Sequence, residues 1–342
     1  MGTEHLRQPA EWAPHRACWL AWPSARDLWE DDLLPAQKEF TALCRAIGQS
    51  EFLEILVADP AARRDAEQAL RGLALRFHEL PYGDIWLRDT APIFSLNAAG
   101  KLRPSRFRFN GWGSKYALPH DDLVASRICE IVGKPSSSFD WILEGGAVDT
   151  DGEGTLLTTE QCLLNPNRHP GGVVPPRAQV EERLCEAFGA TRVVWVRAGL
   201  LNDHTDGHID TIARFASPGT VVCMQARQSD DPNAAVMDEI ARSLESAHDA
   251  QGRRLRVVRV PSPGPVLDEE GEVMPASYMN FYVANHGVVV PVYGTPWDER
   301  AVDEIAALFP GRRTVGLPAK AILSGGGAFH CITQQEPREV TT

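Results

Sequence analysis

Three runs of β-branched and other apolar residues, each led by a glycine, recur at a nearly constant spacing in the second half of the chain. They begin at Gly154, Gly219 and Gly287, which lie 65 and 68 residues apart. Short apolar runs rich in Val, Leu and Thr and bounded by turn residues predict β-strands. Recurrence at this period indicates one supersecondary unit that is used several times.

A helical stretch and then a second strand-like run follow each of these three strands. The helical stretches cover residues 175–189, 230–250 and 295–311, and the runs behind them read TRVVWVR, RLRVVRV and RTVGLPA. Proline lies at or near the start of each stretch, and Gly189 and Gly311 occupy positions where helices commonly end. The pattern therefore predicts a repeated α/β unit.

The first half of the chain extends this pattern. Residues 93–102 supply another such strand, and residues 52–58, 60–72 and 73–80 supply a strand, a helix and a further strand. Dividing 342 residues by the period gives about five units, each too small to bury its own helix face. A closed ring of about five ββαβ-type units meets this requirement; an open α/β sheet with coincidental spacing is the alternative. No linker divides the sequence, so we expect a single catalytic domain over residues 1–342.

The charge balance narrows the range of partners. The chain carries 34 Lys and Arg against 46 Asp and Glu, and its net charge of −12 has the wrong sign for a phosphate backbone or an anionic membrane. Nucleic-acid and membrane partners are therefore not expected, and a small cationic substrate fits better. A moderately acidic surface also serves solubility, so the charge alone selects no function.

The seven cysteines point to a reducing compartment. They are scattered, odd in number and form no CxxC pair, so neither a zinc ribbon nor a disulfide framework is expected. The opening residues MGTEHLRQPAEW contain no basic and apolar leader, and the longest apolar runs are far too short to span a bilayer. We expect a cytoplasmic protein.

Four segments concentrate glycine, tryptophan and ionisable residues beyond what core packing requires. They cover residues 83–94, 141–154, 202–215 and 324–337. In each, an acid, a histidine or a cysteine lies at or beside the end of an expected strand, where a ring or sheet would present it to a common mouth. These side chains are Asp89, Glu144, His208 and Cys331. We expect them to form one central site.

Cys331 lies in an unusual setting for a cysteine that only fills space. It follows the run SGGG and His330, and it precedes a polar run of Thr and Gln. Glycines let the backbone approach a ligand closely, and a thiolate needs polar or cationic surroundings to form at neutral pH. A nucleophilic role is therefore open beside the commoner role of a small buried hydrophobe.

The run HTDGHID places several ionisable groups within seven residues. On an extended segment Asp206, His208 and Asp210 point to the same face, so His208 can carry a proton while Asp210 binds a donor-rich substrate. The rival interpretation is a metal site made from His204, Asp206, His208 and Asp210, although this spacing matches no signature of fixed geometry. A metal-dependent hydrolase stays open at this point.

With these segments in view, the chain resembles the agmatine deiminase and bacterial-type peptidylarginine deiminase family of guanidine-modifying enzymes. The similarity runs nearly end to end, through the blocks PAEWAPHRACWLAWP (residues 9–23), WLRDTAPIF, FNGWGSKY (residues 109–116), ILEGGAVDTDGEGTLLTTEQCLLNPNRHP, GHID, ASYMNFYVANHGVVVPVYG and GGGAFHCITQQEP. The resemblance implies a pentein fold, which is a five-bladed α/β propeller with pseudo-fivefold ββαβ-type repeats around a central active site. The repeat agrees with this fold, although the count alone does not fix closure.

The resemblance also implies a role for each candidate residue. It makes Cys331 the nucleophile, His208 the general acid and base, Glu144 the group that orients this histidine, and Asp89 and Asp210 the acids that bind the guanidinium. Two carboxylates suit a guanidinium because its planar fork presents five N–H donors. Trp86 and Trp112 are expected to flank the substrate, with core packing as the equal alternative. The chemistry needs no metal and no organic cofactor.

The expected reaction is hydrolysis of agmatine to N-carbamoylputrescine and ammonia, a step toward putrescine, through a covalent thiouronium intermediate. Another guanidine such as peptidyl-arginine is the nearest alternative, and a guanidine-binding protein without turnover is a third hypothesis beside the metal-dependent hydrolase. Ala328, Phe329 and Thr211 depart from the family pattern and bear on substrate identity more than on reaction type. A homodimer is the default oligomer.

Overall fold

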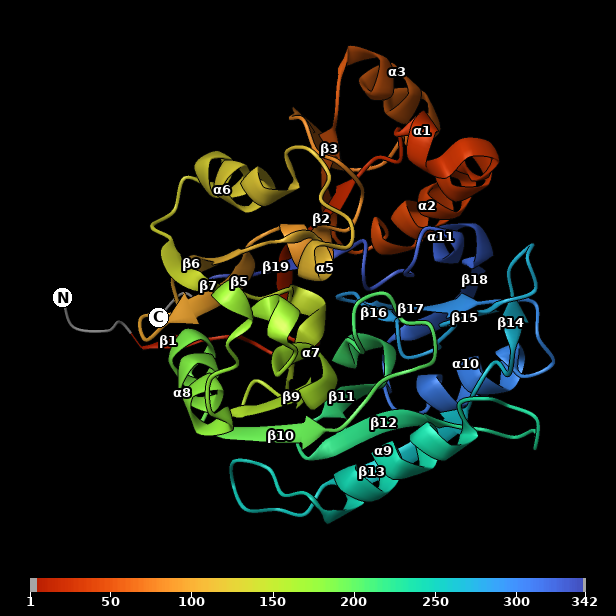
Figure 1. Cartoon of the computed structure of the whole chain (residues 1–342). Helices are drawn as coiled ribbons and strands as arrows, with labels where there is room; N and C mark the ends of the chain where they lie inside the picture. The colour runs from red at the N-terminus through yellow and green to blue at the C-terminus, as the bar shows by residue number, and fades with distance from the viewer. Residues whose placement is uncertain (1–4, 341–342) are drawn as a thin grey trace.

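An antiparallel strand pair followed by a parallel strand is the repeated arrangement of this α/β chain (Figure 1). The computed structural model describes residues 5–340, and within them five sheets of three or four strands share the arrangement. A helix crosses over between the parallel strands of each sheet, as parallel pairing requires. The α/β unit expected from the sequence is therefore confirmed.

Three sheets contain the glycine-led strands of the second half. The first consists of β8 (Asp149–Thr150), β9 (Thr155–Thr159) and β10 (Arg192–Val196), with α8 (Arg177–Phe188) as its crossover. The second consists of β11 (Ala213–Ser217), β12 (Thr220–Gln225) and β13 (Arg256–Pro261), with α9 (Ala234–Ser246). The third consists of β16 (Tyr282–Val283), β17 (Gly287–Val292) and β18 (Arg313–Pro318), with α10 (Asp298–Ala306).

These helices are shorter than the stretches expected from the sequence. α8 ends at Phe188, and Gly189 directly after it caps the helix with a left-handed φ of 67°, which confirms the expected terminus. α10 instead ends at Ala306, so the expected terminus at Gly311 is wrong. Residues 307–311 form turns, because Pro310 has no N–H to continue the helical hydrogen bonds and disfavours helical geometry at Phe309. The ring of Phe309 is buried in the core.

The two sheets of the first half add a fourth strand each. One sheet has the order β1 (Leu6–Arg7), β5 (Ile93–Asn97), β6 (Leu102–Arg108) and β7 (Ser137–Ile142), with α6 (Asp121–Val132) between β6 and β7. The other has the order β19 (Gln334–Pro337), β2 (His15–Ala21), β3 (Phe52–Val57) and β4 (Leu75–Glu79), with α2 (Leu33–Ile47) and α3 (Pro60–Ala69) as crossovers. The last described strand thus completes the sheet of the first unit, because β19 pairs antiparallel with β2.

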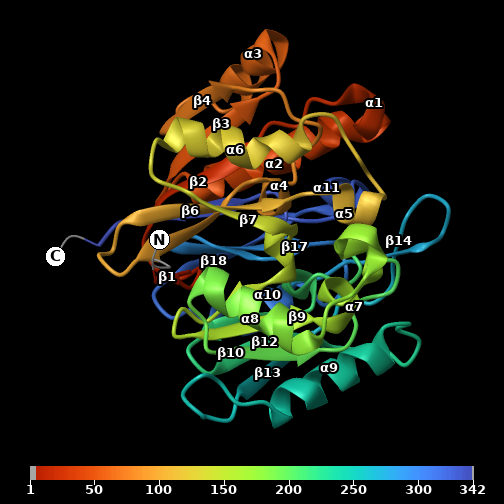
Figure 2. The same ribbon diagram turned by 60° about the vertical axis from the view of Figure 1, so that its left-hand side comes forward.

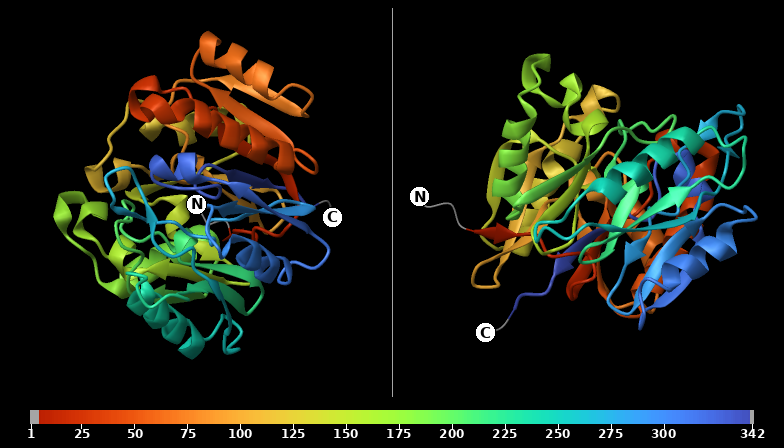
Figure 3. Two further views of the ribbon diagram at one scale, coloured as in Figure 1. Left: turned by 90° about the vertical axis from the view of Figure 1, so that its right-hand side faces the viewer. Right: turned by 90° about the horizontal axis from the view of Figure 1, so that it is seen from below.

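Long helices lie at the outside of the molecule, and short helical segments connect the sheets. Figure 1 shows α3, α6, α8 and α9 at the periphery of the view, with the strands inside them. The short segments are α1 (Arg26–Trp29), η1 (Glu30–Asp32), α4 (Leu87–Thr90), α5 (Gly111–Ser114), η2 (Gly145–Ala147), α7 (Glu160–Leu163), η3 (Pro166–Arg168), η4 (Pro170–Gly172), η5 (Ile209–Thr211) and α11 (Lys320–Ser324). A two-stranded ribbon of β14 (Val266–Leu267) and β15 (Val273–Met274) lies at the edge of the molecule, and its connecting loop projects outward (Figures 2 and 3).

Apolar side chains fill the space between helices and sheets in three buried clusters, the largest of which includes Trp19, Trp22 and Phe40. All seven cysteines lie in the described part of the chain and are free thiols, with only Cys185 partly exposed. No helix within residues 5–340 combines the length and the apolar character needed to cross a bilayer. Residues 1–4 of the opening segment, which contributed to the expected absence of a leader, lie outside the described residues.

Candidate active site

Short helical turns and loops, rather than strands, hold the candidate residues. Asp89 lies in α4, Glu144 directly precedes η2, Asp210 lies in η5 two residues after His208, and Cys331 lies in the turn before β19. α4 contacts η2, and η2 contacts η5, so segments from three different units meet. The structure brings these five side chains into one buried cluster.

Gly146 allows three of these side chains to converge. A Cβ atom added to this residue would lie 2.5 Å from His208 Nδ1, 3.0 Å from Asp89 Oδ1 and 3.1 Å from Asp210 Oδ2. Contacts this short leave no room for a side chain at position 146. The N–H of Gly146 also donates to Asp89 Oδ1 at 2.9 Å. Glycine is therefore required here because the backbone itself forms one wall of the cluster.

The thiol of Cys331 is buried beside an acid and an amide. Its Sγ lies 3.7 Å from Asp210 Oδ2, to which it donates, and Asn280 Nδ2 donates to the sulfur at 3.1 Å. Burial, followed by the charges of Asp210 and Asp89, raises the pKa of this thiol well above its ordinary value. In the absence of a bound cation, Cys331 is therefore a neutral thiol.

Asp89 accepts two hydrogen bonds and still has a raised pKa. Besides the bond from Gly146, its Oδ2 accepts from Trp112 Nε1 at 2.8 Å, so Trp112 contacts the cluster, while its expected place beside the substrate stays a prediction. Burial, followed by the charges of Asp210 and Glu144, raises the pKa of Asp89 to about 8. A cation placed between the acids would oppose this shift by favouring the carboxylate.

Asp210 is ionised although it is fully buried. Its Oδ2 lies 2.7 Å from His330 Nδ1, and His330 Nε2 lies 2.7 Å from Glu11 Oε2. Each ring nitrogen of His330 thus meets one carboxylate oxygen. Burial opposes the ionisation of Asp210, but the hydrogen bond and the charge of His330 lower its pKa overall. Asp210 Oδ1 has no hydrogen-bond partner within residues 5–340.

His208 is a neutral imidazole in this structure. Burial is the largest cause that lowers its pKa, to about 3, and the charge of Arg168 acts in the same direction. Neither ring nitrogen has a hydrogen-bond partner among the described residues, and Nδ1 lies 3.8 Å from Asp89 Oδ1. A neutral imidazole can accept a proton and later return it.

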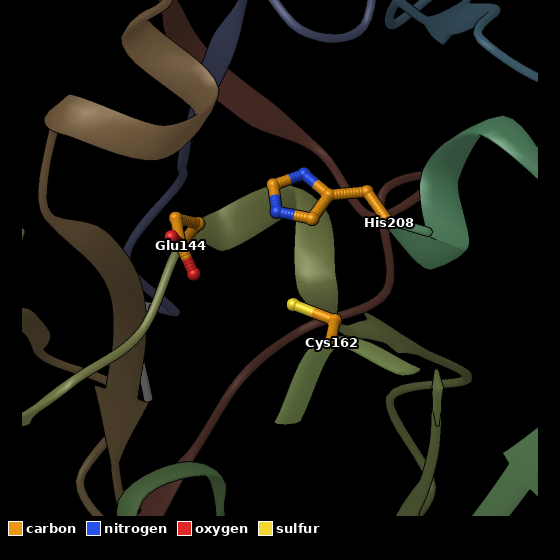
Figure 4. A group of neighbouring side chains, drawn as sticks. All are labelled: Glu144, Cys162 and His208. Atoms are coloured by element: carbon orange, nitrogen blue, oxygen red, sulfur yellow. The ribbon is translucent and has the colours of Figure 1, made fainter. Parts of the chain in front are cut away.

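Glu144 binds Arg168 rather than His208. Its Oε1 accepts from Arg168 Nε at 2.7 Å, and its Oε2 has no partner in the described part of the chain. Burial, only partly offset by the charge of Arg168, raises the pKa of Glu144. A carboxylate oxygen of Glu144 lies within 4.8 Å of a His208 nitrogen (Figure 4). The two side chains are therefore neighbours, without the direct hydrogen bond that an orienting role would use.

The unpartnered polar atoms of this cluster share one neighbourhood. They are Asp210 Oδ1, Glu144 Oε2 and both ring nitrogens of His208. Leaving a buried polar atom without a partner costs about 1–3 kcal/mol, and folded proteins seldom do so without a reason. Carboxylate oxygens and an imidazole around Gly146 suit a cation that carries several N–H donors.

Trp86 packs against the loop that precedes the nucleophile candidate. A Cβ atom on Gly327 would lie 2.7 Å from the Trp86 ring and 3.1 Å from Cys331 Sγ. Trp86 Nε1 donates to Asp84 Oδ2 at 2.8 Å, and Trp29 Nε1 donates to the other oxygen at 2.9 Å. The two indoles stack with centroids 6.1 Å apart. Asp84 thus fixes a pair of aromatic rings beside Cys331.

A second layer behind the site was missed by sequence reasoning. Arg214 Nη2 donates to Glu11 Oε2 at 2.9 Å, so a buried chain of contacts runs from Arg214 through Glu11 and His330 to Asp210. Glu11 and His330 are 319 positions apart. The sequence shows His330 beside Cys331 and shows Glu11 in the PAEW block, but no spacing pairs them.

The structure does not assemble the metal site that the sequence left open at residues 204–210. Asp206 Oδ1 accepts from Lys115 Nζ at 2.6 Å, and His204 Nδ1 lies 2.8 Å from the Tyr116 hydroxyl. Among the described residues, the group with the geometry to hold a metal is instead Glu144, Cys162 and His208. The interpretation of residues 204–210 as the ligand set of a metal-dependent hydrolase is therefore wrong.

A groove of about 1290 Å³ lies outside the glycine run and is rich in acids. Its lining includes Gly326, which precedes Gly327, the glycine that packs against Cys331. The lining also includes residues 202–204, in the loop that leads to His208. Seven carboxylate side chains line it: Asp32, Glu39, Asp203, Asp268, Glu269, Glu270 and Glu272. The lysines of the lining are Lys115 and Lys320. A cation is therefore favoured in this groove over an anion.

Comparison with known proteins gives a consistent result. Residues 7–337 match the model of the Porphyromonas-type peptidyl-arginine deiminases. Agmatine deiminase of Ectopseudomonas mendocina is 38% identical over 358 residues, which cover 98% of this chain and 96% of the relative. Agmatine deiminase of Stutzerimonas stutzeri is 38% identical over 352 residues, with 96% and 95% covered. The solved structure of agmatine deiminase from Enterococcus faecalis matches with a TM-score of 0.93 and 33% identity over 99% of both chains.

Proposed function

The chain belongs to the Porphyromonas-type peptidyl-arginine deiminase family, and we propose that it hydrolyses agmatine to N-carbamoylputrescine and ammonia. The family resemblance noted in the sequence blocks is confirmed by the match over residues 7–337. The enzyme is accordingly a hydrolase that acts on a C–N bond. The proposed chemistry uses side chains and water.

We further propose that the five sheets are the blades of a five-bladed propeller with pseudo-fivefold symmetry, in a single catalytic domain over residues 1–342. The common strand order of the sheets supports this, as does the pairing of β19 with β2, which joins the two ends of the described chain in one sheet. Cytoplasmic location and a homodimer stay predictions.

The observation that carries the proposed reaction is the cluster around Gly146. His208, Asp89 and Asp210 all approach within 3.1 Å of the position that a Cβ atom on this glycine would take, and Cys331 Sγ lies 3.7 Å from Asp210. A thiol, a neutral imidazole and two carboxylates are the groups that a guanidinium hydrolysis by covalent catalysis requires.

Substrate binding prepares the nucleophile. In the proposed complex, Asp89 and Asp210 bind opposite edges of the guanidinium, using Asp210 Oδ1 and the carboxylate of Asp89. The charges of these acids contribute to the raised pKa of the Cys331 thiol. A bound cation offsets them and favours the thiolate, and neutral His208 accepts the proton.

Covalent catalysis then proceeds in two steps. The Cys331 thiolate attacks the central carbon of the guanidinium and forms a neutral tetrahedral adduct. The imidazolium of His208 protonates one amino group, the C–N bond breaks, and ammonia leaves a thiouronium cation bonded to sulfur. His208 then takes a proton from water, and the oxygen adds to the same carbon. Collapse of this second adduct breaks the C–S bond, yields the ureido product and returns Cys331 to the thiol, while the extra proton leaves with ammonia as ammonium.

The acidic groove supports agmatine over a substrate with a carboxylate. The second cation of agmatine, its primary amine, is favoured beside the acids of the groove. Recognition of the carboxylate of arginine would call for an arginine or a lysine at that end. Arg88, Arg168 and Arg214 are buried in the interior. The two lysines of the groove, Lys115 and Lys320, lie among seven acids, and Lys115 already donates to Asp206. Peptidyl-arginine is the remaining alternative within the same chemistry.

One ammonia assay tests the proposal. Agmatine, arginine and a blocked arginine peptide are compared at equal concentration, with and without EDTA, and Cys331→Ser serves as the inactive reference. We expect ammonia from agmatine that survives EDTA and disappears in the variant. Preference for the blocked peptide would transfer the assignment to peptidyl-arginine. Turnover that persists in Cys331→Ser would contradict the covalent mechanism.

A further inference from the structure

Cys162 is buried at the back of the site, and the proposed reaction does not use it. It lies in α7, where its N–H donates to Thr159 Oγ1 at 3.2 Å and fixes the first turn of the helix. Its sulfur points toward Glu144 and His208, as Figure 4 shows. Cys162, Glu144 and His208 are all completely buried.

The donor atoms of these three residues lie close enough to share one ion. One atom from each residue lies within 4.8 Å of the other two. Ligands at the usual zinc distances of about 2.0–2.3 Å are themselves about 3.5 Å apart in a tetrahedral site, so small side-chain movements complete the geometry.

The second observation is the set of unpartnered atoms in the same place. Glu144 Oε2 and both ring nitrogens of His208 are buried without hydrogen-bond partners in the described chain. Arg168 occupies only Oε1 of Glu144 and leaves Oε2 available. Asp210, whose pKa is lowered, shares the Gly146 contact and adds negative charge nearby, and Asp89 Oδ1 lies 3.8 Å from His208 Nδ1.

We propose that Glu144, Cys162 and His208 form an inhibitory site for a thiophilic divalent cation such as Zn²⁺. Sulfur, imidazole nitrogen and carboxylate oxygen are the donors that Zn²⁺ prefers, and three protein ligands leave a fourth position for water. Binding releases the Cys162 proton to solvent and forms three bonds to the metal without any change of oxidation state. The inhibition rests on the proposed function, because metal binding withdraws His208 and Glu144 from deimination. Metal binding itself does not depend on the proposed function.

Cobalt(II) titration of the full chain tests the binding, because cobalt–thiolate bonds absorb in the near ultraviolet and tetrahedral cobalt absorbs in the visible. We expect this spectrum in the unchanged protein and in Cys331→Ser, and its loss in Cys162→Ala. Cys185→Ala, which removes the partly exposed thiol, is the matched control and keeps the spectrum. A spectrum that follows Cys331 or Cys185, or no thiolate band at all, overturns the site.

Ammonia release from agmatine tests the inhibition. Zn²⁺ inhibits the unchanged enzyme and EDTA restores it, whereas Cys162→Ala requires at least about tenfold more Zn²⁺ for the same inhibition. Equal inhibition of both proteins overturns the proposal. If the unchanged protein releases no ammonia, the proposed function fails while the cobalt titration still decides the metal site. If Cys162→Ala does not fold, anomalous scattering from Zn²⁺-soaked crystals of the unchanged protein decides it, and density at Cys331 alone rejects it.

Discussion

His330 Nδ1 and Asp210 Oδ2 are 2.7 Å apart, and this contact joins the residue before the nucleophile to one of the two acids around it. Through Nε2 the same imidazole also contacts Glu11. One side chain therefore fixes an acid of the site against the N-terminal segment. This arrangement leaves Asp210 Oδ1 for the substrate and keeps the carboxylate ionised in the interior.

Replacement of His330 by alanine is expected to destabilise the protein and to raise KM for agmatine. It leaves Asp210 and Glu11 as buried carboxylates with fewer partners, and loss of one member of a buried ion pair costs about 3–5 kcal/mol. Urea unfolding measures the change in the free energy of unfolding. His286→Ala, at an exposed position, is the control and stays within about 0.5 kcal/mol. Equal stability of the two variants would show that the contacts of His330 with Asp210 and Glu11 contribute nothing.

The pH dependence of kcat/KM for agmatine is expected to follow Asp89. The pKa of this carboxyl is raised to about 8 in the free enzyme, so below that pH the group is protonated and must lose a proton before it can bind a guanidinium. kcat/KM therefore rises with pH toward about 8 and then levels, while kcat depends less on pH because the bound cation keeps Asp89 ionised. A kcat/KM that is flat from about pH 6 to about pH 8 would contradict this assignment.

His208→Ala is expected to lower kcat by about 10²–10⁴-fold, because the variant cannot move protons between thiol, leaving group and water. In the unchanged free enzyme the pKa of His208 is about 3, so the imidazole is neutral throughout the working pH range and adds no limb to the kcat/KM profile near neutrality. Steady-state kinetics on both enzymes measures this. Near-normal kcat in the variant would remove His208 from the mechanism.

Gly146→Ala is expected to abolish activity without unfolding the protein. Its Cβ would lie 2.5 Å from His208 Nδ1, and a displacement of about 1 Å at a catalytic group can cost about 100-fold in rate. Gly294→Ala is the control: its φ of 77° makes alanine unfavourable by about 1–2 kcal/mol, but nothing lies within 4 Å of the new Cβ. The control should lose stability and keep activity. An active Gly146→Ala variant would mean that the backbone wall at position 146 tolerates a side chain.

Arg168→Gln is expected to shift the acid side of the activity profile to higher pH. The charge of Arg168 lowers the pKa of Glu144 against the effect of burial, so its removal lets this pKa rise and protonates Glu144 at higher pH. Arg168→Lys keeps the charge but not the planar fork of the guanidinium, so its pH profile should lie between those of the unchanged enzyme and Arg168→Gln. Identical profiles for Gln and Lys would show that the charge is not what matters.

The repeat was visible in the sequence because each unit shows the same local pattern. Gly154, Gly219 and Gly287 lead strands that the structure confirms as β9, β12 and β17. The same local reasoning failed at Gly311, because Pro310 disfavours the helix and the cap of α10 is Ala307, four residues earlier than expected. Local patterns thus located the elements better than their ends.

Within the site, the sequence predicted the chemically distinctive residues but not the buried residues that contact them. Cys331 and His208 lie in runs that a core does not need. Glu11, Arg168 and Arg214 look like ordinary surface charges in the sequence, and only the fold reveals that they are buried partners of the cluster. Gly146 lies in the block ILEGGAVDT, but its closeness to His208 depends on two loops from different units.

The antiparallel pairing of β19 with β2 also sets the order in which the enzyme matures during translation. The ribosome completes β2 long before it reaches β19, so the edge of β2 stays open in the nascent chain and is prone to pair with other molecules. Cys331 emerges only three residues ahead of the strand that covers this edge. The candidate nucleophile and the strand that covers this edge therefore both appear only after the strands of the other four large sheets have been synthesised.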